Sequence, residues 1–287
     1  MQDVNGILSG FFDKMGSTGH IEPQEGMFVD KDGWVRCKVC GELREHELKR
    51  FPGHFVPCIC ACGRARRADE AIQRRESEQM RQAKELYKFS TMDEAKRSAT
   101  FANATINDDV KRAFGVAKSY VEHWPSILRG DEPYQDMRGL LFYGPTGTGK
   151  SYVAACIANE LLAQAVPVLV TSITRLVGNK DDELAETLRA MRKAKLLVLD
   201  DLGAERGTDY RLEQVYNVID SRYDSRLPMV VTTNLTMDQM KTGVDARYNR
   251  IWERIRSTCY PVKMAGGSWR KSKTLETMSK LRDIYGG

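Results

Sequence analysis

The run Gly-Pro-Thr-Gly-Thr-Gly-Lys-Ser at residues 144–151 has the composition and spacing of a phosphate-binding loop, or P-loop. Its glycines allow backbone N–H groups to turn toward a bound phosphate, because no Cβ atom is in the way. Lys150 adds a positive charge for the β- and γ-phosphate oxygens, and the Ser151 hydroxyl is placed to ligate Mg²⁺. The sequence therefore predicts a nucleoside-triphosphate site. Its candidate ATP-binding residues are Gly144, Pro145, Thr146, Gly147, Thr148, Gly149, Lys150 and Ser151.

Two acidic residues follow the apolar run Leu-Leu-Val-Leu at residues 196–199. A carboxylate at the end of a strand can ligate the Mg²⁺ ion beside a P-loop, and Asp200 is predicted to do so together with Ser151. Asp201 is then in place to orient or deprotonate an attacking water. Asn234 ends the next apolar run, and its amide could hold that water or contact the γ-phosphate. With Lys150, these residues form the predicted catalytic group.

Five of the seven cysteines lie within residues 37–62, which indicates a metal site. Tetrahedral Zn²⁺ takes four thiolates, commonly brought in as pairs by tight turns. We expect one cysteine to be spare, and Cys58 is the favoured spare, although Cys58 with Cys62 is an alternative pair. His46 or His54 could replace a thiolate. The predicted zinc ligands are Cys37, Cys40, Cys60 and Cys62.

Short apolar strands alternate with amphipathic helices over residues 99–287, which indicates a parallel α/β sheet with helices on both faces. The strands are expected at residues 140–143, 166–171, 196–200 and 229–233. The P-loop follows the first of these strands, the acidic pair the third and Asn234 the fourth. Since the carboxyl ends of parallel strands share one edge of a sheet, these groups are expected to meet there.

The rest of the chain has a different texture. Residues 1–63 are rich in Gly, Cys and Pro, and are predicted to form a zinc-binding domain that owes much of its folding energy to the metal. Residues 64–98 are predicted to form a charged helical linker. Its arginines could hold a nucleic-acid backbone, whereas the interleaved acidic residues favour solvent or a protein partner. Those arginines are Arg64, Arg66, Arg67, Arg74 and Arg75.

The overall composition is that of an ordinary globular protein, with 41% hydrophobic and 29% charged residues among 287. A net charge of +5 permits a nucleic-acid partner without arguing for one. No apolar run approaches the length of a membrane span, and the start of the chain lacks the pattern of a secretory signal. We therefore expect no membrane partner and a cytoplasmic location, where the cysteines stay reduced.

Three segments together resemble a known family. GLLFYGPTGTGKSYVAACIANEL, the later run LLVLDDLGAERGTDYRLEQVYNVIDSRYDSRLPMVVTTNL, and TFANATINDDVKRAFGVAKSYVEHW at residues 100–124 are similar to the AAA+ ATPases of the DnaC/DnaI helicase-loader and IstB group. The resemblance covers residues 100–270. It implies an AAA+ P-loop core, and because only 17 residues follow Arg270, a reduced lid or none.

The resemblance also implies roles for three arginines. RYNRIWERIRST at residues 247–258 resembles the family's arginine-bearing helix, so Arg254, or alternatively Arg250, would be the finger that reaches the ATP of an adjacent subunit. GGSWRKS at residues 266–272 resembles the family's G-x-S-Y-R ending, with Trp269 in place of Tyr. Arg270 would then contact the nucleotide.

As a function, the resemblance implies an ATP-dependent loader of a hexameric replicative DNA helicase, from a bacterium or its phage. Such a loader would bind ATP, Mg²⁺ and single-stranded DNA and would assemble as a homo-oligomer. An IstB-like transposition helper is the alternative, and it would use duplex DNA and a transposase. A third hypothesis is a zinc-dependent adaptor that binds nucleotide without turnover. The intact Lys150, Asp200, Asp201 and Asn234 argue against it.

Overall fold

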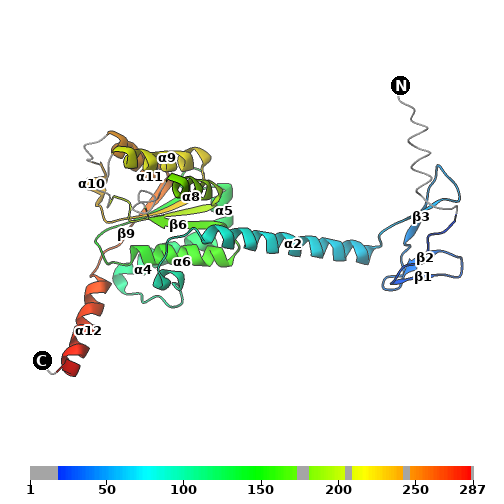
Figure 1. The fold of residues 1–287 in the computed structure, drawn as a ribbon, viewed down its shortest axis with the longest axis horizontal. Coiled ribbons are helices and arrows are strands. Elements are labelled where there is room, and N and C mark those ends of the chain that lie inside the picture. The colour runs from blue at the N-terminus through cyan, green and yellow to red at the C-terminus, as the bar shows by residue number, and fades with distance from the viewer. Residues whose placement is uncertain (1–18, 173–180, 204–208, 242–245, 286–287) are drawn as a thin grey trace. The chain divides into compact units, whose positions relative to one another are not determined.

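The computed structural model describes residues 19–172, 181–203, 209–241 and 246–285, which fall into two compact units (Figure 1). The units are Met1–Glu76 and Ser77–Gly287. Within the described ranges, no helix has both the length and the apolar character needed to cross a membrane.

The first unit is built from two small antiparallel hairpins. Strand β1 (Met27–Val29) pairs with β2 (Val35–Cys37), and β3 (Glu45–Glu47) pairs with β4 (Phe55–Pro57). Glu45 is buried at 1% exposure, and its carboxylate accepts hydrogen bonds from the backbone N–H groups of Val35 (2.7 Å) and Ile21 (2.9 Å). These bonds lower the pKa of Glu45 although burial opposes the shift. A buried carboxylate thus holds the hairpins together where little apolar core exists.

The second unit contains the predicted parallel sheet. In the described part of the chain its five strands lie in the order β6-β7-β8-β5-β9, and every neighbouring pair is parallel. The strands are β5 (Gly139–Tyr143), β6 (Val168–Ser172), β7 (Leu196–Asp200), β8 (Met229–Thr233) and β9 (Cys259–Lys263). Every residue of β7 and β8 is buried, as expected for central strands covered on both faces.

Helices cover both faces of this sheet, as predicted from the sequence (Figure 1). One face carries α4 (Asp108–Glu122) and α6 (Lys150–Ala163). The other carries α8 (Asp181–Lys193), α9 (Asp209–Ser225) and α11 (Ala246–Thr258). Shorter helices join these elements, namely α3 (Glu94–Arg97), α5 (Trp124–Arg129) and α10 (Met237–Lys241).

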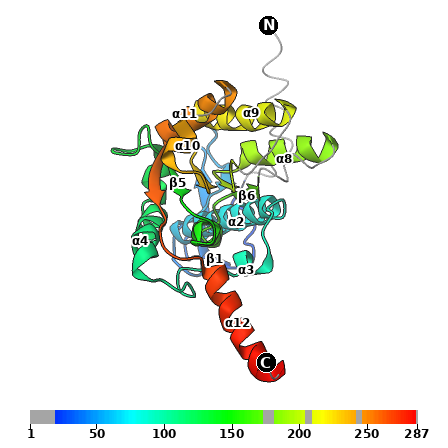
Figure 2. The same ribbon diagram turned by 90° about the vertical axis from the view of Figure 1, so that its left-hand side faces the viewer.

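Three features differ from, or add to, the sequence-based expectation. The edge strand β9 was not predicted, and the helix expected at residues 64–98 is α2 (Ala61–Tyr87), which ends eleven residues earlier. The segment at residues 88–99 instead lies along the sheet and contains α3. The last element is the single helix α12 (Trp269–Tyr285), which extends away from the sheet in Figure 2.

Candidate nucleotide and metal sites

The P-loop connects β5 to α6 and has the backbone shape that its glycines allow. Gly144, Gly147 and Gly149 have φ angles of 135°, 86° and 96°, in the region that favours glycine. A Cβ atom at Gly144 would lie 2.1 Å from the backbone oxygen of Met264, and one at Gly147 would lie 2.1 Å from Ser268 Oγ. Larger residues are therefore excluded from a loop whose amides can surround a phosphate.

Lys150 is the first residue of α6, and it is only 4% exposed. Its Nζ atom donates hydrogen bonds to the backbone oxygens of Gly144 (2.9 Å) and Pro145 (2.7 Å). Thr148 Oγ1 also donates to the Pro145 oxygen at 3.0 Å, which holds the loop closed. Ser151 follows in the first turn of α6. The ammonium is thus fixed within the loop where the phosphates of a nucleotide would bind.

The structure brings the predicted acidic residues and Asn234 together at the carboxyl ends of β7 and β8. Asn234 Nδ2 donates to Asp201 Oδ1 at 3.1 Å, and Asp200 is 8% exposed. Asp201 has a φ of 57°, a strained value for a residue other than glycine, and such strain is concentrated at functional sites. Because β5, β7 and β8 are parallel, the acidic pair lies at the same edge of the sheet as the P-loop, and carboxylate oxygens are ligands that Mg²⁺ prefers.

Thr232 is a further residue of this site that the sequence analysis missed. It is fully buried, its Oγ1 donates to Asp200 Oδ1 at 2.7 Å, and it accepts a hydrogen bond from the Asp201 N–H group at 2.9 Å. One hydroxyl thereby orients both acidic residues. The sequence gives only a weak sign that Thr232 belongs to the site, because a threonine inside a buried strand is common in any sheet.

Lys96 is the second residue that was missed. It lies on α3, more than one hundred positions before the acidic pair, and its Nζ atom is 3.1 Å from Asp200 Oδ2. Nothing in the local sequence distinguishes it from the other lysines of the linker. Both oxygens of Asp200 therefore have a donor, one from Thr232 and one from Lys96.

The two candidate finger arginines lie in different environments on α11. Arg254 forms an ion pair with Asp220 of α9 and donates to the Tyr216 hydroxyl at 3.2 Å. Its guanidinium also lies 4.8 Å from the ring centre of Tyr223. Arg250, one turn earlier, is exposed. Arg254 is thus engaged with its own chain, whereas Arg250 faces solvent.

The region around Arg270 is tied to the P-loop through the backbone. The Trp269 N–H group donates to the Gly147 oxygen at 3.0 Å, so α12 begins directly beside the loop. The side chain of Arg270 lies outside the described part of the structure. Its predicted contact with the nucleotide therefore stays a prediction.

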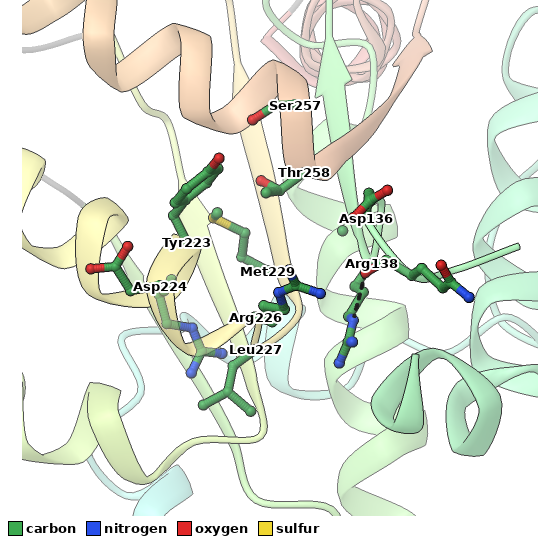
Figure 3. A pocket seen from close by; sticks show the side chains of 12 residues that line it. Asp136, Arg138, Tyr223, Asp224, Arg226, Leu227, Met229, Ser257 and Thr258 are labelled. Carbon is green, nitrogen blue, oxygen red and sulfur yellow. Dashed lines mark hydrogen bonds between the residues drawn. The ribbon is translucent and has the colours of Figure 1, made fainter. Parts of the chain in front are cut away.

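A separate cavity of about 490 Å³ opens at the other edge of the sheet, where β5 and β8 begin. Figure 3 shows Arg138 and Asp136 on one side of it and Arg226 and Tyr223 on the other. Because the P-loop lies at the carboxyl ends of the strands, this cavity is not the nucleotide site. Arg222, which also lines it, is buried and donates to backbone oxygens, so it connects the end of α8 to the start of β8.

In the first unit, the thiols of Cys37, Cys40, Cys60 and Cys62 lie within 4.8 Å of one another. Cys62 Sγ is 3.3 Å from Cys60 Sγ, 3.4 Å from Cys40 Sγ and 3.6 Å from Cys37 Sγ. Four sulfurs around a tetrahedral Zn²⁺ ion are separated by about 3.8 Å, so the group fits this metal. The thiol of Cys58 instead donates to the Leu43 backbone oxygen at 3.3 Å, outside the group.

The environment of Cys37 favours the thiolate that a metal needs. The backbone N–H groups of Cys40 and Val39 point at its sulfur and lower the pKa of Cys37 to about 6. The turn after Cys37 is possible because Gly41 has a φ of 72°. Among the described residues, neither His46 nor His54 belongs to the cluster.

A P-loop between β5 and α6, an acidic pair at the end of β7 and a polar residue at the end of β8 define an AAA+ P-loop ATPase core. Residues 72–277 match the family described as "IstB-like ATP binding protein". The match covers more than two thirds of the chain, so this protein belongs to that family.

The chain is similar to named helicase loaders. It is 26% identical to "Replicative helicase loader DnaI" of Bacillus subtilis over 251 residues, covering 82% of this chain and 78% of that protein. It is 24% identical to "Replicative helicase loader DnaC" of Escherichia coli, covering 71% of this chain and 85% of that protein. The crystal structure of DnaI has a TM-score of 0.50 at 28% identity, over 62% of this chain and 94% of that chain.

Proposed function

We propose that this protein is an ATP-dependent loader of a replicative DNA helicase that binds ATP with Mg²⁺ and single-stranded DNA. The observation that supports the proposal is that the P-loop, the acidic pair and Asn234 each follow the carboxyl end of a strand in one parallel sheet, in a chain similar to two named loaders. The similarity to DnaI covers 82% of the chain, more than the unit Ser77–Gly287 alone could supply. It therefore extends into the cysteine-bearing unit, which we propose docks on the helicase.

Each residue of the site has a role that follows from its position. The P-loop amides and Lys150 would bind the phosphates, and Ser151 with Asp200 would hold Mg²⁺, which neutralises phosphate charge. Asp201, oriented by Thr232 and Asn234, would position and deprotonate the attacking water. In the first unit, Cys37, Cys40, Cys60 and Cys62 would hold Zn²⁺ and so fix the hairpins that meet the partner.

The transposition helper remains the second candidate, because the matching family is described by the IstB-like proteins. Both candidates share the ATPase core, so the partner distinguishes them. Co-purification of the intact chain with a bacterial replicative helicase, in the presence of a slowly hydrolysed ATP analogue, tests the proposal. We expect a complex that depends on the first unit. The loader proposal would be contradicted if the chain did not bind the helicase but did bind duplex DNA and a transposase.

The finger arginine can be tested in mixed assemblies. Of the two candidates, Arg250 fits the role better, because its side chain is exposed while Arg254 is paired with Asp220. We expect Arg250→Ala to lower hydrolysis in the assembly by roughly 10³-fold and to leave nucleotide affinity unchanged, since the finger stabilises transition-state charge in trans. The measurement is steady-state ATPase activity together with binding of a fluorescent ATP analogue.

The control for this experiment is Arg254→Ala. Loss of its ion pair and ring contacts should lower the free energy of unfolding by about 2 kcal/mol. Mixing Arg250→Ala with Asp201→Asn subunits should restore part of the activity, because each mutant supplies what the other lacks. If only Arg254→Ala shows this complementation, Arg254 is the finger.

A further inference from the structure

Lys96 contacts the acidic pair from a segment that precedes the whole sheet in the sequence. Its Nζ atom lies 3.1 Å from Asp200 Oδ2 and 3.8 Å from Asp93 Oδ2, and about a quarter of its side chain is exposed. Asp200 Oδ1 is already bonded to Thr232. The ammonium therefore neutralises the carboxylate that we assign to Mg²⁺.

The segment that carries Lys96 is fixed to the ATPase core at several points. The Thr91 N–H group donates to the Val170 oxygen (2.8 Å), and the Val170 N–H group donates to Ser90 Oγ (3.0 Å), so the segment lies along the edge strand β6. Farther along, Asn159 of α6 donates to the backbone oxygens of Lys96 and Ala99, both at 2.8 Å. These bonds hold α3 where its lysine reaches Asp200.

The same segment is directly continuous with α2. Tyr87, the last residue of α2, donates through its hydroxyl to Asn159 Oδ1 at 2.5 Å. Asn159 thus contacts the end of α2 on one side and the α3 backbone on the other. A displacement at the end of α2 would pull directly on the residues that position Lys96.

We propose that Lys96 competes with Mg²⁺ for Asp200, so that the segment at residues 88–99 couples α2 to the nucleotide site. A monovalent ammonium and a divalent cation repel each other at adjoining positions on one carboxylate, so Mg²⁺ binding requires Lys96 to withdraw. The inference rests on the proposed nucleotide site. The further point is that the Lys96 ammonium occupies Asp200 before Mg²⁺ binds, and that it leaves together with the segment at residues 88–99.

The test measures the Mg²⁺ concentration at which the full-length chain half-maximally binds a fluorescent, slowly hydrolysed ATP analogue. Lys96→Met should lower this midpoint by about tenfold, because a partly exposed ion pair no longer has to be broken. Lys96→Arg keeps the charge and should stay near the wild type. Lys118→Met, an exposed lysine on α4, is the matched control and should not change the midpoint.

A second measurement does not depend on the variants. Hydrogen exchange of residues 88–99 in the wild type should become faster when Mg²⁺ is added to protein already mixed with the nucleotide, since the segment loses its lysine contact. An unchanged or raised midpoint for Lys96→Met, or unchanged exchange, would overturn the inference. If the wild type shows no Mg²⁺-dependent nucleotide binding, the proposed function itself fails.

Discussion

Replacing Lys150 with alanine should weaken binding of an ATP analogue by about 10²- to 10³-fold, which corresponds to roughly 3–4 kcal/mol. The reason is the position of its ammonium, which is almost fully buried and held by the backbone oxygens of Gly144 and Pro145. A bound phosphate would lose its only point charge from the P-loop. Equilibrium titration with a fluorescent analogue measures the effect.

The Asp201→Asn variant separates binding from hydrolysis in the same site. It keeps the shape of the side chain and the hydrogen-bonding capacity toward Asn234, so nucleotide affinity should remain near that of the wild type. Its turnover should fall strongly, because an amide cannot accept the proton of the attacking water.

The prediction for Lys150→Ala has its own contradicting result. If this variant binds the nucleotide with unchanged affinity, the P-loop is not the nucleotide site.

Removal of zinc should unfold the first unit and leave the ATPase unit folded. Structural zinc sites supply roughly 10–16 kcal/mol of binding free energy, and two hairpins of three-residue strands cannot replace that amount by burial. We expect one zinc per chain by metal analysis. After treatment with a chelator, hydrogen exchange should become fast over residues 19–60 and stay slow in β7 and β8.

Two cysteine variants are matched for this experiment. Cys60→Ser removes a member of the four-thiol cluster and should lose the metal, whereas Cys58→Ser changes a thiol bonded to the Leu43 oxygen and should keep it. A zinc-free chain whose hairpins still exchange slowly would contradict the assignment. Zinc loss in Cys58→Ser with zinc retained in Cys60→Ser would favour the alternative pair of Cys58 with Cys62.

Much of the ATPase core could be predicted because its local patterns are strong. The strands β7 and β8 begin and end at the predicted residues, and β5 begins one residue earlier than expected. The sequence did not reveal β9, because Pro261 interrupts a run of only five residues that is exposed at three of them. It becomes a strand through pairing with β5, which is a tertiary effect.

The missed residues share a cause. Lys96 and Thr232 act through partners that are far away in the chain, and their own neighbours give no sign of this. The zinc ligands could not be chosen from the sequence for the same reason, since the spacing of the cysteines also allows Cys58 as a ligand. Its exclusion depends on where the chain directs each thiol after β4. Motifs made of adjacent residues are visible in the sequence, and constellations assembled by the fold are not.

The margins of the parallel sheet also bear on how copies of this chain could associate. On the β6 side, Ser90 and Thr91 already occupy the main-chain groups of Val170, and on the β9 side Pro261 has no N–H group to offer. Both flanks are therefore poor templates for strand addition. Subunits that associate should therefore do so through helices and loops. Aggregation by edge pairing is suppressed as long as the segment at residues 88–99 stays bonded to β6.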